Sequence, residues 1–249
     1  VFEVWLGWIY DWTNIFEKPL ATYLTSVSSD HTHILGKSLA KIQKDKMWII
    51  KPGVPIYTPI WNKLMVEWTK KAWWILKTIK DKIPTNLNWS HQKRNASLVY
   101  HSLTNLGFDP KKILNWLQNI QIKWRIDFIE PDILLDWCHN LWWVKELKKF
   151  IKTLKYSRII TVFATTRSNE ELLGFCNIIN WEIKILTKPK IFRTRKPKDF
   201  ENVIQWNKII INNPREALDY AKSIKKDWDL IVVYWSLFLI WNILKILES

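Results

Sequence analysis

The chain has 249 residues, enough for one large domain or two small ones, and 48% of them are hydrophobic, so a sizeable core is available. Its two cysteines provide neither a disulfide framework nor a CxxC metal pattern, and no signal-peptide pattern is present, which favours the cytoplasm. The formal net charge is +15, but the lysines are scattered along the whole chain without an RNA-binding motif, so we expect no nucleic-acid partner.

The first half of the chain mixes short apolar runs with helical periodicity. Pro52-Gly53 marks a turn, and Gly107 closes a helix. The predicted strands span residues 2–6, 21–27 and 54–58, and the predicted helices span residues 38–46, 62–80, 95–106 and 110–119.

The second half alternates regularly between strands and helices. This alternation predicts an α/β fold with a mostly parallel sheet and helices on both faces. A domain boundary is expected near residues 119–126, and the basic segment 188–199, with two prolines, is predicted to be a solvated loop. The predicted strands span residues 133–136, 159–164, 183–186 and 230–233, and the predicted helices span residues 141–154, 169–179, 214–224 and 237–247.

No membrane span is expected. The longest apolar stretch, residues 230–244, is shorter than the roughly 18 residues that a transmembrane helix requires. It divides better into a buried strand followed by a helix.

The segment DILLDWCHN, residues 132–140, combines a buried strand with polar residues at its carboxyl end. Ile133 to Leu135 form the apolar run, and Asp136, His139 and Asn140 follow it. In an open α/β sheet, ligands bind at that end of the strands. The alternative is an ordinary strand end followed by a helix N-cap.

This segment resembles the LLDGAHN motif of the folylpolyglutamate synthase and dihydrofolate synthase family, with Trp137 in place of Gly. Further segments resemble the family's motifs in the same order along the chain. They are EVWLGWIYDWTN (residues 3–14, resembling EVGLGGRLDATN), Thr25-Ser26 with Asp30-His31 and Leu35-Gly36 (TSI, DH and LG), DKMWIIKPGVP (45–55, EKAGIIKPGVP), KWRID (123–127, the PGR segment) and YWSLFLIWNI (234–243, TGSLYLVGEV).

The resemblance implies a Mur-ligase-like architecture. Residues 1–122 would be the carboxyl-terminal part of a central ATP-binding domain, and residues 123–249 a Rossmann-like glutamate-ligase domain. The implied protein is a cytoplasmic monomer that uses ATP and Mg²⁺ to add L-glutamate to a folate or dihydropteroate carboxylate through an acyl phosphate.

Three residues are implied Mg²⁺ ligands by the same resemblance: Glu3, His31 and Lys46. Glu3 stands between Phe2 and Val4, where a buried carboxylate is costly unless it is paired or bound to metal. Lys46 matches a family lysine that is carbamoylated, which turns a cation into a carboxylate. The simpler alternatives are a salt bridge for Glu3, a structural role for His31 and a solvated helix position for Lys46.

The remaining candidate residues are assigned to the substrates. Ile9 stands where the family commonly has Arg, which puts recognition of the pterin substrate in doubt. The resemblance assigns nucleotide binding to Asn95, Arg125 and Asp136, pteroate binding to Tyr10, Asp11 and Trp12, the glutamate site to His139 and Ser236, and catalysis to Lys46, Asp136 and His139.

Tryptophan is abundant where glycine is scarce. The chain contains 19 Trp and 5 Gly, whereas average usage predicts roughly 17 Gly. Because Gly serves positive φ angles or close approach of backbone, and Trp is the largest side chain, the exchange is physically unreasonable. We hypothesise that UGA codons that the organism translates as Gly are written here as Trp; the alternative is a truly Trp-rich protein. The family motifs have Gly at Trp5, Trp8, Trp48, Trp124, Trp137, Trp235 and Trp241.

Three other functions compete with this interpretation. They are a Mur-type amino-acid ligase, an inactive remnant or binding module, and a basic nucleic-acid-binding protein. The sequence opens at Val1 and contains no GxxxxGK[ST] pattern, whereas the family carries a GTNGKGS-like phosphate loop upstream. We therefore expect a fragment that has no ligase activity by itself, since ATP would lack its main cradle. Glutamate addition by this 249-residue chain would contradict that expectation.

Overall fold

The computed structural model describes residues 1–4, 11–27, 38–60, 62–71, 75–87, 89–138, 141–169, 172, 183–191, 194–205 and 207–247, without the side chains of Lys71, Ser90, Leu141 and Trp142. The chain forms two compact units, Val1–Gln121 and Ile122–Ser249. Each unit is described by itself.

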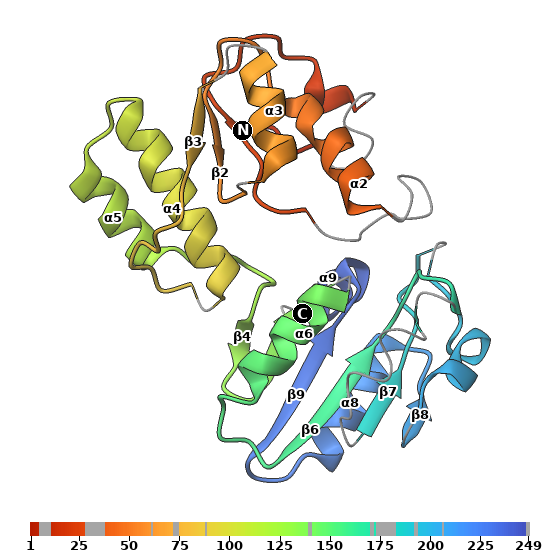
Figure 1. Ribbon diagram of the computed structural model, residues 1–249. Coiled ribbons are helices and arrows are strands. Elements are labelled where there is room, and N and C mark those ends of the chain that lie inside the picture. Colours follow the sequence, from red (N-terminus) through yellow and green to blue (C-terminus); the bar gives the residue numbers. More distant parts are fainter. Residues whose placement is uncertain are drawn as a thin grey trace. The chain divides into compact units, whose positions relative to one another are not determined.

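The first unit contains a small parallel sheet with helices (Figure 1). The strand order is β1 (Thr22–Tyr23), β2 (Ile56–Thr58) and β3 (Leu76–Thr78), with Ile56 opposite both Thr22 and Leu76. The helices are α2 (Leu39–Lys46), α3 (Lys63–Lys71), α4 (Ser90–Asn105) and α5 (Pro110–Asn119), and the short 3-10 helices are η1 (Trp12–Asn14) and η2 (Met47–Ile49).

Two tyrosines connect this sheet to α4. The hydroxyl of Tyr23 lies 2.5 Å from Oγ of Ser102, and Nδ2 of Asn105 donates to the hydroxyl of Tyr57 at 2.9 Å. The two tyrosine rings also stack, with centroids 5.8 Å apart. An apolar cluster in the same unit includes Met47 of η2; its buried members are Val4, Leu24, Met47, Ile50, Ile56 and Met65.

Capping side chains mark the amino-terminal ends of α5 and α3. Asp109 caps α5 by accepting a hydrogen bond from the N–H of Lys111, and Pro110 occupies the first helical position. Oδ1 of Asn62 accepts the N–H of Met65 at the start of α3 and also the amide of Gln43. The predicted boundaries of residues 110–119 are confirmed because these signals are local.

The second unit is a six-stranded sheet in the order β4-β5-β9-β6-β7-β8. All neighbouring strands are parallel except β4, which runs antiparallel to β5. The strands are β4 (Asp127–Glu130), β5 (Ile133–Asp136), β6 (Arg158–Phe163), β7 (Ile183–Leu186), β8 (Lys208–Ile210) and β9 (Asp229–Tyr234), accompanied by α6 (Leu141–Ile151), α8 (Pro214–Ile224), α9 (Leu237–Leu247), η3 (Pro197–Asp199) and η4 (Glu201–Val203).

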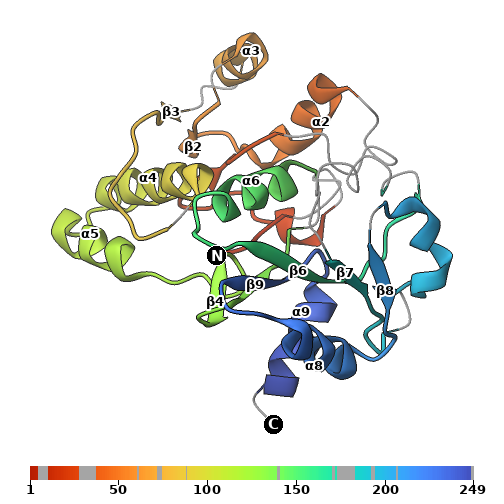
Figure 2. The ribbon, with the colours of Figure 1, turned by 90° about the horizontal axis from the view of Figure 1, so that it is seen from below.

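Helices cover both faces of this sheet. Figure 2 shows α6 on one face and α8 with α9 on the other. The connection from β5 through α6 to β6 and the connection from β8 through α8 to β9 cross the sheet in opposite directions. Because such crossovers are right-handed, their helices must lie on opposite faces.

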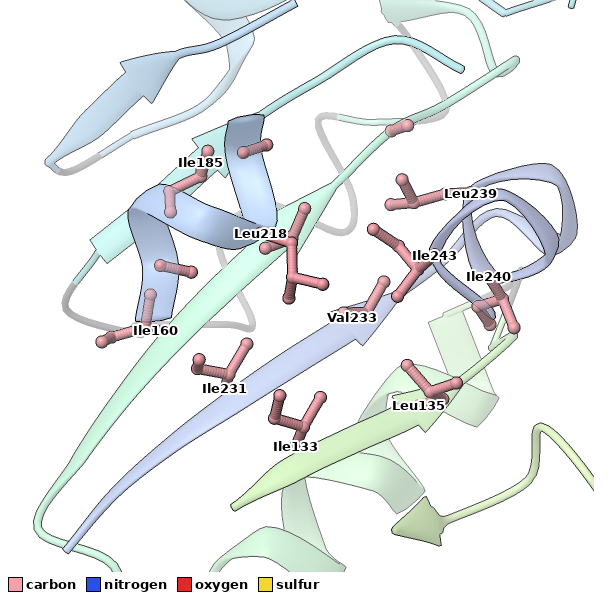
Figure 3. Close-up of a cluster of buried hydrophobic side chains, with 14 residues drawn as sticks. Ile133, Leu135, Ile160, Ile185, Leu218, Ile231, Val233, Leu239, Ile240 and Ile243 are labelled. Atoms are coloured by element: carbon pink, nitrogen blue, oxygen red, sulfur yellow. The ribbon is translucent and has the colours of Figure 1, made fainter. Parts of the chain in front are cut away.

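The core of the second unit lies beneath α8 and α9 (Figure 3). Alternate residues of the strands, such as Ile133 and Leu135 or Ile231 and Val233, point to this face. Leu218 of α8 packs into the same cluster. All six residues of β9 are buried, as expected for a central strand covered on both sides.

An ion pair joins the amino ends of β6 and β9. Nε of Arg158 donates to Oδ2 of Asp229 at 3.0 Å, and its NH2 donates to the carbonyl of Ile224 at 2.8 Å. The start of β6 is thereby joined to the start of β9 and to the end of α8. Arg158 holds the pKa of Asp229 below its ordinary value, so this pair stabilises the fold except in strong acid.

The predicted α/β architecture with a mostly parallel sheet is confirmed. The strand at residues 133–136 and the helices at 214–224 and 237–247 have the predicted bounds. The antiparallel β4 and the edge strand β8 were not predicted. The predicted helix 169–179 lies almost entirely outside the described residues.

Four local predictions were wrong. The predicted helix 62–80 ends at Lys71, and residues 76–78 form β3 because they pair with β2. The predicted strand 21–27 is reduced to Thr22–Tyr23, and residues 2–4 form no strand. The segment 188–199 is not simply a solvated loop, since Thr194 and Pro197 are buried.

Within the described parts of the chain, no helix combines the length and the hydropathy that crossing a bilayer requires.

We predict that Ile231→Ala lowers the free energy of unfolding by about 2–5 kcal/mol, because it leaves a cavity in the central strand. The matched control is Ile122→Ala, whose side chain is 41% exposed and which should cost much less. Urea denaturation monitored by circular dichroism measures both. Equal losses in the two variants would contradict the assigned core.

Candidate functional site

The carboxyl ends of the neighbouring strands β5 and β9 lie side by side in the second sheet. Asp136 pairs with Tyr234, and the N–H of Trp235 donates to the carbonyl of Asp136 at 3.3 Å. Asp136 and Ser236, which are 100 residues apart in the sequence, therefore lie at the same edge. Ligands bind at this edge in open α/β sheets.

Asp136 is fully buried, and both of its carboxylate oxygens accept backbone hydrogen bonds. Oδ2 accepts the N–H of Ile126 at 2.9 Å, and Oδ1 accepts the N–H of Cys138 at 2.8 Å. Burial raises the pKa of Asp136 from 3.8 to about 6, although Arg125 and the two N–H groups lower it in part. The carboxylate therefore holds the turn before β4 against the end of β5.

Arg125 lies in that turn, beneath two indoles. The carbon of its guanidinium is 4.2 Å from the ring centroid of Trp137 and 3.9 Å from that of Trp143. Both separations are within the range of cation–π attraction. The arginine is half-buried, so its guanidinium stays next to the carboxyl end of β5 and is only partly in contact with solvent.

Ser236 begins α9. Its Oγ accepts the N–H of Leu239 at 3.3 Å, and its carbonyl accepts the N–H of Ile240. This is the arrangement of an N-cap residue. The hydroxyl, for which the motif resemblance implies a glutamate site, therefore caps the helix.

Cys138 is a buried free thiol next to Asp136. Burial, assisted by the charge of Asp136, raises the pKa of the Cys138 thiol well above its ordinary value. The thiol therefore stays protonated and acts as a small apolar side chain, not as a nucleophile.

In the first unit, hydrogen bonds join two of the motif segments. Asp11 caps η1 by accepting the N–H of Thr13 at 2.9 Å, and the hydroxyl of Thr13 donates to the carbonyl of Glu3 at 3.1 Å. Nδ2 of Asn14 donates to the carbonyl of Trp48 at 3.2 Å. The segment 11–14 thus brings Glu3 close to η2, which directly follows Lys46.

The burial of Glu3 differs from the prediction. Glu3 is exposed, so the premise that it is a buried carboxylate in need of compensation was wrong. An exposed carboxylate oxygen still suits Mg²⁺. Lys46, half-buried at the end of α2, does not fit a divalent cation as an ammonium and fits it only as a carbamate. Within the described residues, no group of three or more His, Cys, Asp or Glu could hold a metal ion.

Three predicted site residues, Tyr10, His31 and His139, lie outside the described residues. The side chain of Trp12 is 90% exposed, and Asn95 is half-buried in α4. The described candidates thus form two groups: Glu3, Asp11, Trp12, Lys46 and Asn95 belong to the first unit, and Arg125, Asp136 and Ser236 to the second.

A shallow hollow at the amino ends of β5, β6 and β9 contains none of the predicted site residues. Its position is opposite to the strand ends that carry Asp136, and two of its carboxylates are paired, Asp132 with Lys225 and Asp229 with Arg158. It is lined by Pro131, Asp132, Tyr156, Lys225, Asp227, Trp228 and Asp229. We assign it no role.

Sequence reasoning did not identify two features of these groups. Thr13 and Asn14 end the first motif, and their role as links to Glu3 and Trp48 was not assigned. The two indoles over Arg125 were also not predicted, because residues 137 and 143 are distant from residue 125 in the sequence.

No family model matches the chain. The dihydrofolate synthase/folylpolyglutamate synthase of Bacillus subtilis is 24% identical over 290 residues, which cover 100% of this chain and 67% of that protein. The E. coli FolC structure in complex with DHPP and ADP superposes with a TM-score of 0.83 at 18% identity, covering 99% of this chain and 65% of that one. A bifunctional folylpolyglutamate synthase/dihydrofolate synthase from Yersinia pestis, complexed with AMPPNP and Mn ion, gives a TM-score of 0.84 at 16% identity over 99% and 66%.

These comparisons confirm the resemblance that the motifs indicated, and they confirm the fold. The chain spans about two-thirds of the length of these relatives.

We predict that the contribution of Asp136 to the free energy of unfolding falls as the pH rises, whereas that of an ordinary ion-paired carboxylate rises. Because the pKa of Asp136 is raised from 3.8 to about 6, its stabilising contribution is full below pH 3.8 and is lost as the pH rises through about 6. Relative to Asp136→Asn, the free energy of unfolding of the unsubstituted protein should therefore fall by about 3 kcal/mol over this window.

Urea denaturation at a series of pH values measures this difference. Asp127→Asn is the control, since its carboxylate accepts the N–H of Trp124 in the same turn while Asp136 remains intact. Parallel pH curves for Asp136→Asn and the unsubstituted protein would contradict the assignment.

Proposed function

We propose that this chain acts in an ATP-dependent ligase, starting from the premise that its sequence and fold are those of the folylpolyglutamate synthase and dihydrofolate synthase family. The reaction joins L-glutamate to a carboxylate of a folate or dihydropteroate substrate through an acyl phosphate. Relatives named as folate enzymes make a Mur-type amino-acid ligase the less favoured alternative.

One observation carries the proposal: Arg125, Asp136 and Ser236 meet at the carboxyl edge of β5 and β9, where the DILLDWCHN segment ends. This edge is the usual ligand position in an open α/β sheet. It presents a fixed cation beside a buried carboxylate, which suits an anionic substrate.

In this proposal Arg125 contacts the nucleotide. A guanidinium can donate two parallel hydrogen bonds to phosphate oxygens, which makes it well suited to ATP. Asp136 acts chiefly as a positioning residue, because its oxygens are engaged by the N–H groups of Ile126 and Cys138. It fixes the turn from which Arg125 projects. His139 and Ser236 are assigned to the incoming glutamate.

The first unit is assigned to the metal and the second substrate. Glu3, His31 and a carbamoylated Lys46 would hold Mg²⁺, which supplies charge neutralisation at the transferred phosphoryl group when bound. Support comes from the hydrogen bonds that hold the Glu3 backbone near η2. Asp11, with Tyr10 and Trp12, is assigned to the pteroate group, and Asn95 to the adenine.

The proposal extends to organisation. Residues 1–122 would be part of the central ATP-binding domain and residues 123–249 the glutamate-ligase domain. We place the protein in the cytoplasm as a monomer without a nucleic-acid or membrane partner, since two cysteines and scattered lysines fit such a protein.

The test is glutamate incorporation by the protein as the source cell makes it. It is incubated with ATP, Mg²⁺, labelled L-glutamate and either dihydropteroate or tetrahydrofolate, and labelled product and ADP are measured. We expect ATP-dependent incorporation with at least one acceptor. The absence of incorporation with both acceptors would overturn the proposed function.

Arg125→Ala should lower kcat/KM for ATP by about 10- to 100-fold, the loss expected for one charged hydrogen-bonding group. Arg125→Lys should retain part of the activity because it keeps the charge. Arg215→Ala removes an exposed arginine of α8 and should leave the activity unchanged. Equal activities of Arg125→Ala and Arg215→Ala would contradict the role of Arg125.

A further inference from the structure

Four non-glycine residues in the described part of the chain have a positive φ, and three of them are tryptophans. The angles are +66° at Trp124, +65° at Trp228 and +83° at Trp235, and the fourth residue is Ile126 at +50°. Because 19 of the 249 residues are Trp, four positions drawn at random would on average include fewer than one Trp. A positive φ at so bulky a residue is a genuine outlier.

Hydrogen bonds fix the backbone at each of the three tryptophans. The N–H of Trp124 donates to Oδ2 of Asp127 at 3.0 Å, and the N–H of Trp235 donates to the carbonyl of Asp136 at 3.3 Å. The carbonyl of Trp228 accepts the N–H of Ser157 at 2.7 Å. Each of these hydrogen bonds uses a backbone group of the tryptophan, so glycine at the same position could form it equally well.

The side chains offer no common reason for tryptophan. Trp228 is 71% exposed and Trp235 is 4% exposed, so burial of an indole cannot explain both. What the three positions share is the backbone conformation that glycine adopts without steric cost. The two described glycines with positive φ, Gly53 at +72° and Gly107 at +90°, have the same conformation.

We propose that the polypeptide made in the source cell carries glycine at positions 124, 228 and 235, and that the written tryptophans are UGA codons which this organism translates as glycine. Positions 124 and 235 are also ones where the motif resemblance places glycine. Position 228 belongs to no motif, so its assignment comes from the backbone alone. The inference does not depend on the proposed function.

The site changes if the same exchange applies at Trp137, where the motif resemblance also places glycine. One of the two indoles over Arg125 would then be absent, and part of the guanidinium surface would be open to a ligand. This consequence, unlike the exchange itself, rests on the proposed function.

Mass spectrometry of the protein isolated from its source cells tests the proposal directly. Trypsin should release one peptide, residues 227–245, because no Lys or Arg interrupts it before Lys245. This peptide contains positions 228 and 235. Glycine at both supports the proposal, and tryptophan at either position overturns it. Ligase assays have no bearing on this result, so failure of the proposed function is separately recognisable.

A second test needs only recombinant protein. At position 228, Trp228→Gly should have a Tm about 2–4 °C above that of Trp228→Ala, because alanine retains the strain of a positive φ. Trp116 is the matched control: it is 53% exposed but lies within α5, where glycine is the poorer helix former. Trp116→Gly should therefore melt below Trp116→Ala. The same order at both positions, with alanine the more stable, would overturn the requirement for glycine at position 228.

Discussion

One buried carboxyl group, that of Asp136, links the turn before β4 to the end of β5 in the second unit. Asp136 ends a strand that is covered on both faces, and it accepts hydrogen bonds from a turn ten residues earlier and from the residue two positions later. Removing a charge from water costs free energy, and the two N–H groups together with Arg125 offset that cost only in part, which is why its pKa stays near 6. The turn that it holds contains two residues with positive φ, Trp124 and Ile126, so the carboxylate keeps strained backbone in place.

Several candidate site residues also have scaffold roles. Asp136 holds a turn, the Ser236 hydroxyl caps α9, and Asp11 caps η1 while Thr13 anchors the backbone of Glu3. Side chains whose hydrogen bonds are already satisfied by the backbone keep a fixed position before any ligand arrives. Such preorganisation is what electrostatic recognition of a phosphate or a carboxylate requires. It also means that a substitution at these positions changes the fold and the site together.

The tryptophans connect the sequence and the backbone in an unusual way. Composition alone indicates that glycine is missing, and motif resemblance indicates where. The φ angles at Trp124, Trp228 and Trp235 add a stereochemical argument, because a left-handed backbone disfavours any side chain with a Cβ. At Trp228 the angle identifies a position that no motif marks. This reasoning does not extend to a tryptophan within a helix. At Trp116, for example, glycine would weaken α5.

The sequence by itself determined the features that local signals encode. The strand at residues 133–136 has an uninterrupted apolar run, the helix at 110–119 has its own Asp-Pro start, and the order of the motifs indicated the resemblance to folylpolyglutamate and dihydrofolate synthases. Tertiary structure alone decided the rest. Residues 76–78 follow a helical pattern but pair with β2, and β4 has no strong pattern of its own. Glu3 follows an apolar residue yet is exposed, and the indoles over Arg125 come from positions 12 and 18 residues away. Pairing, burial and stacking of this kind depend on which segments meet in space, and no local spacing specifies that.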